Sequence, residues 1–212
     1  ERAGKAVPSE YSLVFPERLT SVSQSDLFTV EKPTEECLKG KSFVVVDIET
    51  TGLSFVGGDK ITEIGAVRIV DGKIVDKFQT LINPEQSISK EITSLTGIDD
   101  SMVANSPTFD KVIPDFYKYC YGSTIVAHNI EFDYKFIKFM AQNSGYTFKN
   151  PGIDTLAFSK SALPRMKNYK LNTVCGYFGI QFLHHRALSD AHATAQLFIK
   201  LAEVKKSLPE AL

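Results

Sequence analysis

The pattern of apolar and polar positions predicts a domain in which strands and helices are mixed. Five segments have the apolar or alternating composition that is typical of strands. The second and third are joined at Asp71-Gly72, a pair that favours a tight hairpin turn. The predicted strands are residues 42–48, 61–70, 73–82, 124–127 and 152–154.

Apolar residues follow a helical period in the segments between and after these strands. Ser106-Pro107 is expected to provide the N-cap and first position of one helix, and Pro114 predicts a kink or a break inside it. The predicted helices are residues 107–120, 131–143, 155–162, 171–177 and 189–206. Strands followed by alternating helices and short strands indicate an α/β fold, with a central mixed sheet flanked by helices.

Residues 1–40 differ from the rest of the chain, because three prolines interrupt a stretch with no sustained period. Several apolar residues in this stretch make it unlike a pure linker. It is either an extension, packed on the domain or left from a larger protein, or an arm that docks a polymerase or another partner. We expect the domain itself to span residues 41–206, with a short tail at 207–212. Because the chain starts at Glu1 and not at Met, we expect it to be a processed product or a piece of a longer protein.

Composition narrows the class of protein. A chain of 212 residues with 43% hydrophobic content can bury one good core. Three widely spaced cysteines without a CxxC pattern favour a reducing, cytoplasmic location. No apolar run approaches the length of a transmembrane helix, so no membrane partner is expected. A net charge of −1 argues against coating nucleic acid through charge alone, but it is compatible with an enzyme that holds one strand end.

Four carboxylates lie where apolar side chains are expected. Asp47 and Glu49 share one face of the first strand, and Asp133 and Asp190 occupy the apolar faces of their helices. A carboxylate directed at a core costs several kcal/mol unless a cation compensates it. Mg²⁺ prefers such hard oxygen ligands. We therefore expect the four acids to hold two Mg²⁺ ions about 3.5–4 Å apart, an arrangement suited to phosphodiester hydrolysis, with Mn²⁺ as a substitute.

His185 is the candidate general base, because imidazole changes its charge near neutral pH. His184 does not have the expected spacing from Asp190, so we interpret it as structural or solvent-facing. His128 is expected to support the site through hydrogen bonds, and His192 to lie on the surface.

The motifs DIETTG, HN-x-x-FD and H-x-x-x-x-D, in this order, resemble the three motifs of the DnaQ-like 3′–5′ exonucleases of the DEDDh type. The segments HHRALSD, NPGIDTL and NYKLNTVC are most similar to the epsilon-type proofreading subunit, or the built-in exonuclease domain, of bacterial DNA polymerase III. The resemblance covers about residues 41–205. It implies a ribonuclease-H-like fold, and it implies the role of general base for His185.

Substrate contacts are expected beside the first two acids. Thr50 and Gly52 can offer a hydroxyl and backbone N–H groups to a terminal 3′ nucleotide. The resemblance implies that Leu53 is a wedge against the last base and that Asn129 orients the substrate or the site, although Leu53 could equally be a core leucine. The family often has an acid at the position of Glu63, which we interpret either as structural or as a support for the metal-binding acids. Asp154 is interpreted as support for the fold. A basic run that contains Lys160, Arg165, Lys167 and Lys170 either follows the phosphate backbone or forms a solvated face.

The leading hypothesis is a metal-dependent 3′–5′ exonuclease that releases nucleoside 5′-monophosphates from single-stranded or frayed 3′ ends of DNA. It would serve as a replicative proofreader, with a DNA polymerase subunit as its partner. The alternative is an exoribonuclease, since nothing in the sequence tests for recognition of a 2′-hydroxyl. A non-catalytic nucleic-acid-binding module is a third interpretation, and the complete set of reactive side chains argues against it.

Overall fold

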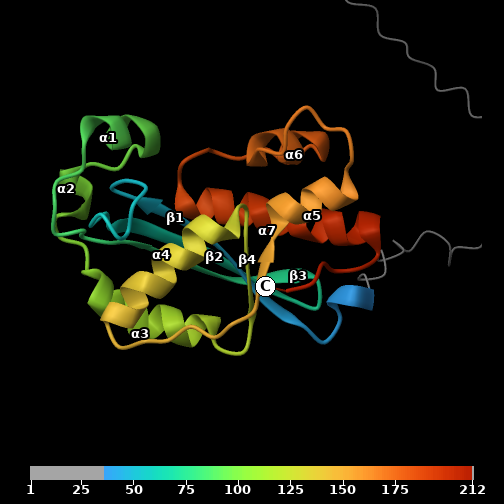
Figure 1. Ribbon diagram of the computed structural model, residues 1–212, viewed down its shortest axis with the longest axis horizontal. Coiled ribbons are helices and arrows are strands. Elements are labelled where there is room, and N and C mark those ends of the chain that lie inside the picture. Colours follow the sequence, from blue (N-terminus) through green and yellow to red (C-terminus); the bar gives the residue numbers. More distant parts are fainter. Residues whose placement is uncertain (1–35, 212) are drawn as a thin grey trace, which may run out of the picture. The chain divides into compact units, whose positions relative to one another are not determined.

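A five-stranded sheet in the order β3-β2-β1-β4-β5 organises residues 36–211, which are the residues described by the computed structural model (Figure 1). β2 pairs antiparallel with both β1 and β3, whereas β4 pairs parallel with both β1 and β5. All five predicted strands are confirmed, and β1 extends through Glu49 and Thr50. The strands are β1 (Ser42–Thr50), β2 (Ile61–Val70), β3 (Lys73–Leu81), β4 (Thr124–Ala127) and β5 (Gly152–Asp154).

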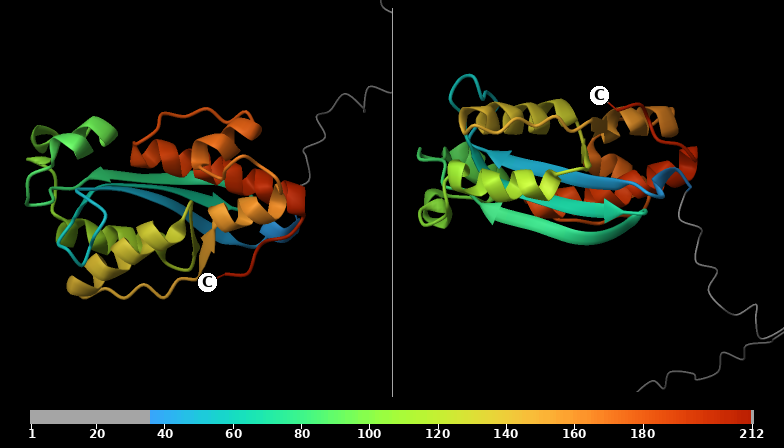
Figure 2. Two further views of the ribbon diagram at one scale, coloured as in Figure 1. Left: turned by 45° about the horizontal axis from the view of Figure 1, so that its top comes forward. Right: turned by 90° about the horizontal axis from the view of Figure 1, so that it is seen from below.

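Helices cover both faces of this sheet, which confirms the predicted α/β class (Figure 2). One face packs against α3 (Phe109–Cys120) and α4 (Ile130–Asn143). The other packs against α5 (Thr155–Ala162), α6 (Leu171–Tyr177) and α7 (Ala187–Lys205). The remaining short helices are the 3₁₀ helix η2 (Glu36–Leu38), α1 (Lys90–Thr96) and α2 (Asp100–Val103). In residues 36–211, no helix is both long and apolar enough to cross a membrane.

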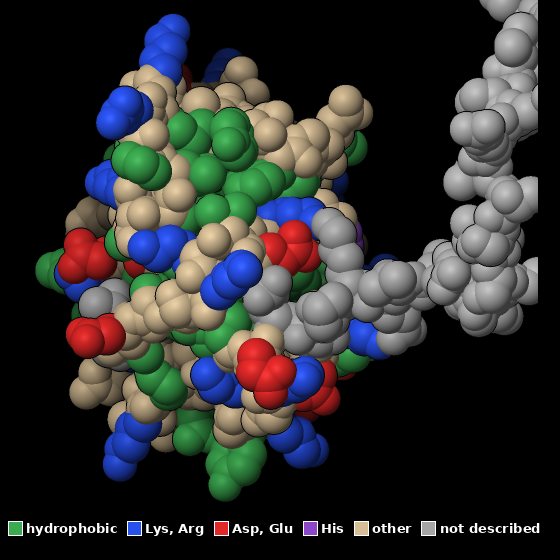
Figure 3. All heavy atoms as spheres, turned by 90° about the vertical axis from the view of Figure 1, so that its right-hand side faces the viewer, with side chains coloured by type: hydrophobic (Ala, Val, Ile, Leu, Met, Phe, Trp, Pro, Cys, Tyr) green, Lys and Arg blue, Asp and Glu red, His purple; other side chains and the backbone are tan. Residues whose placement is uncertain are grey.

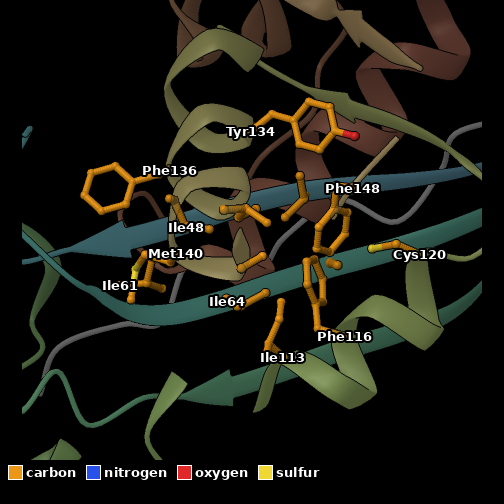
Figure 4. Close-up of a cluster of buried hydrophobic side chains, with 14 of the residues drawn as sticks. Ile48, Ile61, Ile64, Ile113, Phe116, Cys120, Tyr134, Phe136, Met140 and Phe148 are labelled. Atoms are coloured by element: carbon orange, nitrogen blue, oxygen red, sulfur yellow. The ribbon is translucent and has the colours of Figure 1, made fainter. Parts of the chain in front are cut away.

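β1 is buried on both faces because it lies between the two helical layers. Val44, Val46 and Ile48 point into the core shared with α3 and α4, which Figure 4 shows around Ile48. Phe43 and Val45 point into the core shared with α7. A strand covered on both sides is apolar almost throughout. The alternation along β1 also places Asp47 and Glu49 on the α7 side, at the carboxyl end of the strand.

The start of α3 corrects one prediction. The N-cap of this helix is Thr108 and not Ser106. The backbone N–H of Asn83 donates to the Pro107 carbonyl over 3.0 Å, and this pairing keeps the chain extended just before the helix. Pro114 does not break α3, which continues to Cys120.

Two other features bear on the predicted boundaries. The helices α1 and α2 were not predicted. α2, with four residues, is too short to show a helical period, and α1 contains only two apolar side chains, Ile92 and Leu95. Most of the predicted arm, residues 1–35, lies outside the described residues. Within residues 36–40, Leu38 is buried in the same core as Phe43. The boundary at residue 40 stays a prediction.

Charged side chains are not sorted by sign on the face shown in Figure 3. Lys and Arg side chains are interspersed there with Asp and Glu side chains. This mixture agrees with the net charge of −1. On this face, therefore, no broad field of one sign marks a surface for nucleic acid.

The turn between β2 and β3 leads to a stability prediction. Asp71 (φ 51°) and Gly72 (φ 73°) are both left-handed, as a type I′ turn requires. Gly72→Val forces a β-branched residue into this conformation, so we expect the free energy of unfolding to fall by about 1–2 kcal/mol in urea titrations. Gly176→Ala in α6 is the control, because an added Cβ there meets no atom within 4 Å. Equal stability of the two variants would contradict this account of the turn.

Candidate active site

Three of the four predicted acids meet at the carboxyl end of β1. Asp47 and Glu49 come from β1, and Asp190 comes from the first turn of α7. Each of the three offers a carboxylate oxygen, and these oxygens lie within 4.8 Å of one another. We call this group the carboxylate cluster. Asp190 follows the two acids of β1 by more than a hundred residues, so only the packing of α7 against the sheet assembles the cluster.

Asp133 lies next to the carboxylate cluster but has a different partner. It is buried in the first turn of α4, and its Oδ1 accepts a hydrogen bond from the Ile48 backbone N–H at 3.1 Å. This bond attaches α4 to β1 between the two acids of the strand. Asp133 repels Asp47 electrostatically, although its oxygens are not among those of the cluster.

The turn before α4 is fixed by an acid from the neighbouring strand. Asn129 has left-handed backbone angles (φ 68°), and its N–H donates to Asp154 Oδ1 over 2.9 Å. The same oxygen accepts the N–H of Leu156 at the start of α5. Asp154 thus supports the fold, as expected from the sequence. The exposed Asn129 side chain lines a cavity beside the acids.

Burial raises the pKa values of all four acids, and repulsion by neighbouring carboxylates adds to the shift of Asp47, Glu49 and Asp133. Burial raises the pKa of Glu49 to about 8, with Asp190 adding to the effect, and burial raises the pKa of Asp133 to about 7. The pKa of Asp47 is raised well above its ordinary value by burial and by the charges of its acidic neighbours. Burial also raises the pKa of Asp190, although the Arg186 backbone N–H and His184 oppose the shift.

This donor set fits divalent cations. The ligand atoms are carboxylate oxygens, which hard ions such as Mg²⁺ prefer. The raised pKa values mean that the ionised forms of these acids are disfavoured when no positive charge is close. A divalent cation provides such a charge. The site thus has both the ligand type and the electrostatic demand for a cation.

A cavity of about 530 Å³ opens beside the acids. Both candidate histidines, His184 and His185, line it. Sequence reasoning did not single out Phe132, Leu171 or Asn172, although all three lie in segments that carried the family resemblance. The lining residues are Asp47, Ile48, Glu49, His128, Asn129, Phe132, Asp133, Lys170, Leu171, Asn172, His184, His185 and Asp190.

His184 is exposed, as expected from the sequence, but it also contacts an acid of the carboxylate cluster. Its Nδ1 lies 3.6 Å from Asp190 Oδ1, and its ring packs against Phe182. His185 is exposed and has left-handed backbone angles (φ 60°). The irregular backbone before α7 turns both rings towards the cavity, which a count of residues to Asp190 does not reveal.

His128 connects two walls of the cavity. Its Nδ1 lies 3.0 Å from Thr155 Oγ1, and its Nε2 lies 2.8 Å from the Tyr169 carbonyl oxygen. Burial lowers the pKa of His128, which favours the neutral ring. The supporting role expected from the sequence agrees with these contacts, since they hold the loop that presents Lys170. His192 is exposed, as expected.

The predicted substrate contacts after Glu49 are Thr50, at the end of β1, and Gly52 and Leu53 in the loop that follows. None of the three is among the residues that line the cavity. Thr50 is buried, and its hydroxyl donates to the Gly52 carbonyl at 2.6 Å. A Cβ on Gly52 would lie 2.5 Å from the Asp59 carboxylate oxygens, so a larger residue there would displace the Asp59 side chain. Leu53 is 82% exposed, which excludes the core interpretation of this residue. The role of Leu53 as a wedge remains a prediction.

Sequence comparisons agree with this geometry. Residues 44–198 match the model of the RNase_T family, described as exonuclease. The chain is 50% identical over 171 residues to a PolC-type DNA polymerase III of Caldanaerobacter subterraneus subsp. tengcongensis, covering 80% of the chain and 12% of the polymerase. It is 43% identical over 176 residues to the corresponding polymerase of Thermotoga petrophila, covering 82% of the chain and 13% of that protein. The chain thus spans only about an eighth of the length of these relatives.

Solved structures share the fold. Exonuclease X, in complex with 5′-overhanging duplex DNA, matches with a TM-score of 0.64 and 29% identity, covering 78% of this chain and 97% of that one. The nuclease domain of 3′hExo, a DEDDh family member bound to rAMP, matches with a TM-score of 0.69 and 19% identity. This match covers 81% of this chain and 98% of the 3′hExo chain. The second likeness concerns the fold alone. Together they confirm the ribonuclease-H-like arrangement.

The raised pKa values predict how pH acts on the metal-free protein. These carboxyls bind protons more tightly in the folded state, so their stabilising effect is complete below the unfolded pKa of about 4. That effect is lost as pH rises through the folded pKa values, about 7 for Asp133 and about 8 for Glu49. In EDTA we therefore expect Tm to fall between about pH 5 and about pH 8.5. Mg²⁺ should raise Tm most at the upper end of this range.

Glu49→Gln is the variant that tests this explanation. Removing one charge from the cluster should raise Tm at about pH 8 in EDTA by on the order of 5 °C and flatten the pH dependence. Glu131→Gln, on the same helix as Asp133 but 73% exposed in its side chain, should behave like the wild type. The measurement is thermal unfolding followed by circular dichroism. A wild-type Tm that rises across this range would contradict the assigned pKa shifts.

Proposed function

The chain belongs to the RNase_T exonuclease family, and on that premise we propose that it is a 3′–5′ exonuclease domain of the DEDDh type. In this proposal it removes nucleoside 5′-monophosphates from single-stranded or frayed 3′ ends of DNA. The observation that carries this proposal is the carboxylate cluster, in which oxygens from β1 and α7 lie within 4.8 Å of one another at the wall of an open cavity. Buried acids in contact with one another have no structural benefit of their own, because each destabilises the others.

We propose that Asp47, Glu49, Asp133 and Asp190 hold two Mg²⁺ ions, for which Mn²⁺ can substitute. A pair of divalent cations stabilises the charge that develops on the attacking and leaving oxygens of a phosphodiester. Asp47 is repelled by the other three acids, so a cation held beside it would relieve repulsion from all of them.

The histidine and the cavity walls have separate tasks in this proposal. His185 accepts the proton of the attacking water, while the bond between phosphorus and the 3′ oxygen of the preceding nucleotide breaks. The products are a nucleoside 5′-monophosphate and a strand that is one nucleotide shorter. Lys170 and Asn129 face the same cavity and can orient the phosphate and the terminal sugar. Leu53, exposed on the neighbouring loop, can pack against the terminal base.

The partner that we propose is a DNA polymerase. The curated relatives are named as PolC-type DNA polymerase III, and this chain aligns with about an eighth of their length. An exonuclease joined to a polymerase receives frayed ends directly from the site of synthesis. Removing nucleotides from such ends is the task of proofreading. A cytoplasmic location remains a prediction from the pattern of cysteines.

A nuclease assay tests the proposed function. We expect 5′-labelled single-stranded DNA to shorten from its 3′ end with release of monophosphates in Mg²⁺ or Mn²⁺, and EDTA to abolish the reaction. Asp47→Ala should lower the rate at least about a hundredfold, while Glu131→Gln should leave it unchanged. The same oligonucleotide as RNA is the comparison. Faster cleavage of RNA would support the exoribonuclease alternative, and cleavage without metal would contradict the site.

A second prediction separates the two histidines. If His185 is the base, His185→Ala should lower the single-turnover rate by about 10²–10⁴ and remove the acidic limb of the pH–rate profile. His184→Ala removes a contact with Asp190 and not the base, so its loss should be smaller and its acidic limb should persist. Both variants should still bind single-stranded DNA in Ca²⁺. A larger loss for His184→Ala would assign the base to His184.

A further inference from the structure

Glu63 is a fully buried carboxylate that the proposed chemistry does not use. It stands directly opposite Glu49 in the pairing of β1 with β2, yet it is not part of the carboxylate cluster. Its oxygens accept hydrogen bonds from Gln79 Nε2 at 2.8 Å, from the Ala187 backbone N–H at 3.1 Å and from Arg186 Nε and Nη2 at 3.3 Å. A buried carboxylate beside other acids requires a cation, and Arg186 supplies one from a position 123 residues away in the sequence.

Arg186 links this ion pair to the catalytic machinery. Its side chain reaches back to Glu63, while its own backbone N–H donates to Asp190 Oδ2 at 3.1 Å. It is the N-cap residue of α7 and directly follows His184 and His185. The placement of one residue therefore governs the orientation of a cluster acid and of both histidines.

The start of α7 is also pressed against β2 at the same level. A Cβ on Gly65, two residues after Glu63, would lie 2.1 Å from the Leu188 nitrogen and 2.2 Å from the Ala187 carbonyl carbon. Backbone contact this close is possible only at glycine. Gly65 fixes the separation of helix and strand, and the ion pair between Glu63 and Arg186 fixes how the helix start is turned.

We infer that Glu63 and Arg186 are positioning residues that set the placement of Asp190 and the two histidines relative to Asp47 and Glu49. They thereby control how tightly the site holds a divalent cation and how fast it turns over, without touching the substrate. This inference rests on the proposed function for its effect on turnover, but its effect on cation affinity can be measured separately.

The first test uses Glu63→Gln, which keeps the size of the side chain and removes its charge, and Arg186→Gln, which removes the charge and shortens the side chain. Mn²⁺ affinity, followed by the EPR signal of the free ion, should weaken by about 10–100-fold in each variant. kcat on single-stranded DNA should fall by a similar factor, while KM stays within about threefold of wild type. Arg186→Lys, which restores the charge without the paired donors, should recover part of the Mn²⁺ affinity.

The two residues should behave as one unit. In the double variant Arg186→Gln with Glu63→Gln, the loss of Mn²⁺ affinity should be close to that of the larger single loss and not to their product. If the loss of Mn²⁺ affinity in the double variant equals the product of the two single losses, the two residues act independently, and the inference is overturned.

Arg68→Gln is the matched control for loss of structure. Arg68 lies on the same strand as Glu63 and donates to Ser123 Oγ at 3.1 Å and to the Tyr119 carbonyl, far along β2 from the cluster. Its loss should lower Tm but leave Mn²⁺ affinity and kcat unchanged at a temperature where circular dichroism shows the folded protein. Wild-type Mn²⁺ affinity and kcat in folded Arg186→Gln would overturn the positioning role.

The outcomes also separate this inference from the proposed function. If the wild type cleaves neither DNA nor RNA but Arg186→Gln weakens Mn²⁺ binding as expected, the proposed function fails and the positioning role stands. If the wild type is active and Arg186→Gln matches it in both measurements, the proposed function stands and the positioning role fails.

Discussion

Repulsion among the carboxylates buried at the end of β1 is the interaction on which the arrangement of the rest of the site depends. Two like charges about 4–5 Å apart repel by roughly 3–4 kcal/mol at an effective dielectric constant of about 20. Several such pairs amount to a large part of the net stability of a domain of this size, about 5–15 kcal/mol. The molecule reduces this repulsion by raising the pKa values of the acids, by the backbone hydrogen bonds to Asp133 and Asp190, and by placing His184 and Arg186 beside them. The rigid layers on both sides of the sheet keep the acids from moving apart.

The same constraint explains which parts of the molecule the sequence predicts. Acids at strand and helix positions that should be apolar can be recognised from the sequence alone. The reason is that the periods of 2.0 residues in a strand and 3.6 residues in a helix assign each residue to a face. The strands, the main helices and the convergence of Asp47, Glu49 and Asp190 could all be predicted in this way. The turn at Asp71-Gly72 could also be predicted from the sequence, because its backbone angles restrict the residue types.

Features that arise from tertiary contact could not be predicted. The N-cap of α3 is displaced to Thr108 by pairing with Asn83, which lies 25 positions earlier in the chain. The approach of His184 to Asp190 depends on the irregular backbone before α7 and not on residue spacing. The pairing of Glu63 with Arg186 joins segments that no local pattern connects. In each case the deciding partner is distant in sequence, so periodicity carries no information about it.

The position of α7 has a consequence for the order of events during synthesis. This helix carries Asp190 and packs against β1 and β2, although those strands leave the ribosome well over a hundred residues earlier. Contacts of such long sequence separation form late, after the loop between them has closed. A nascent chain therefore holds Asp47 and Glu49 without their partner, and it cannot form a complete nuclease centre until its last helix has docked. The fold thus delays the appearance of a potentially destructive activity until the domain around it is complete.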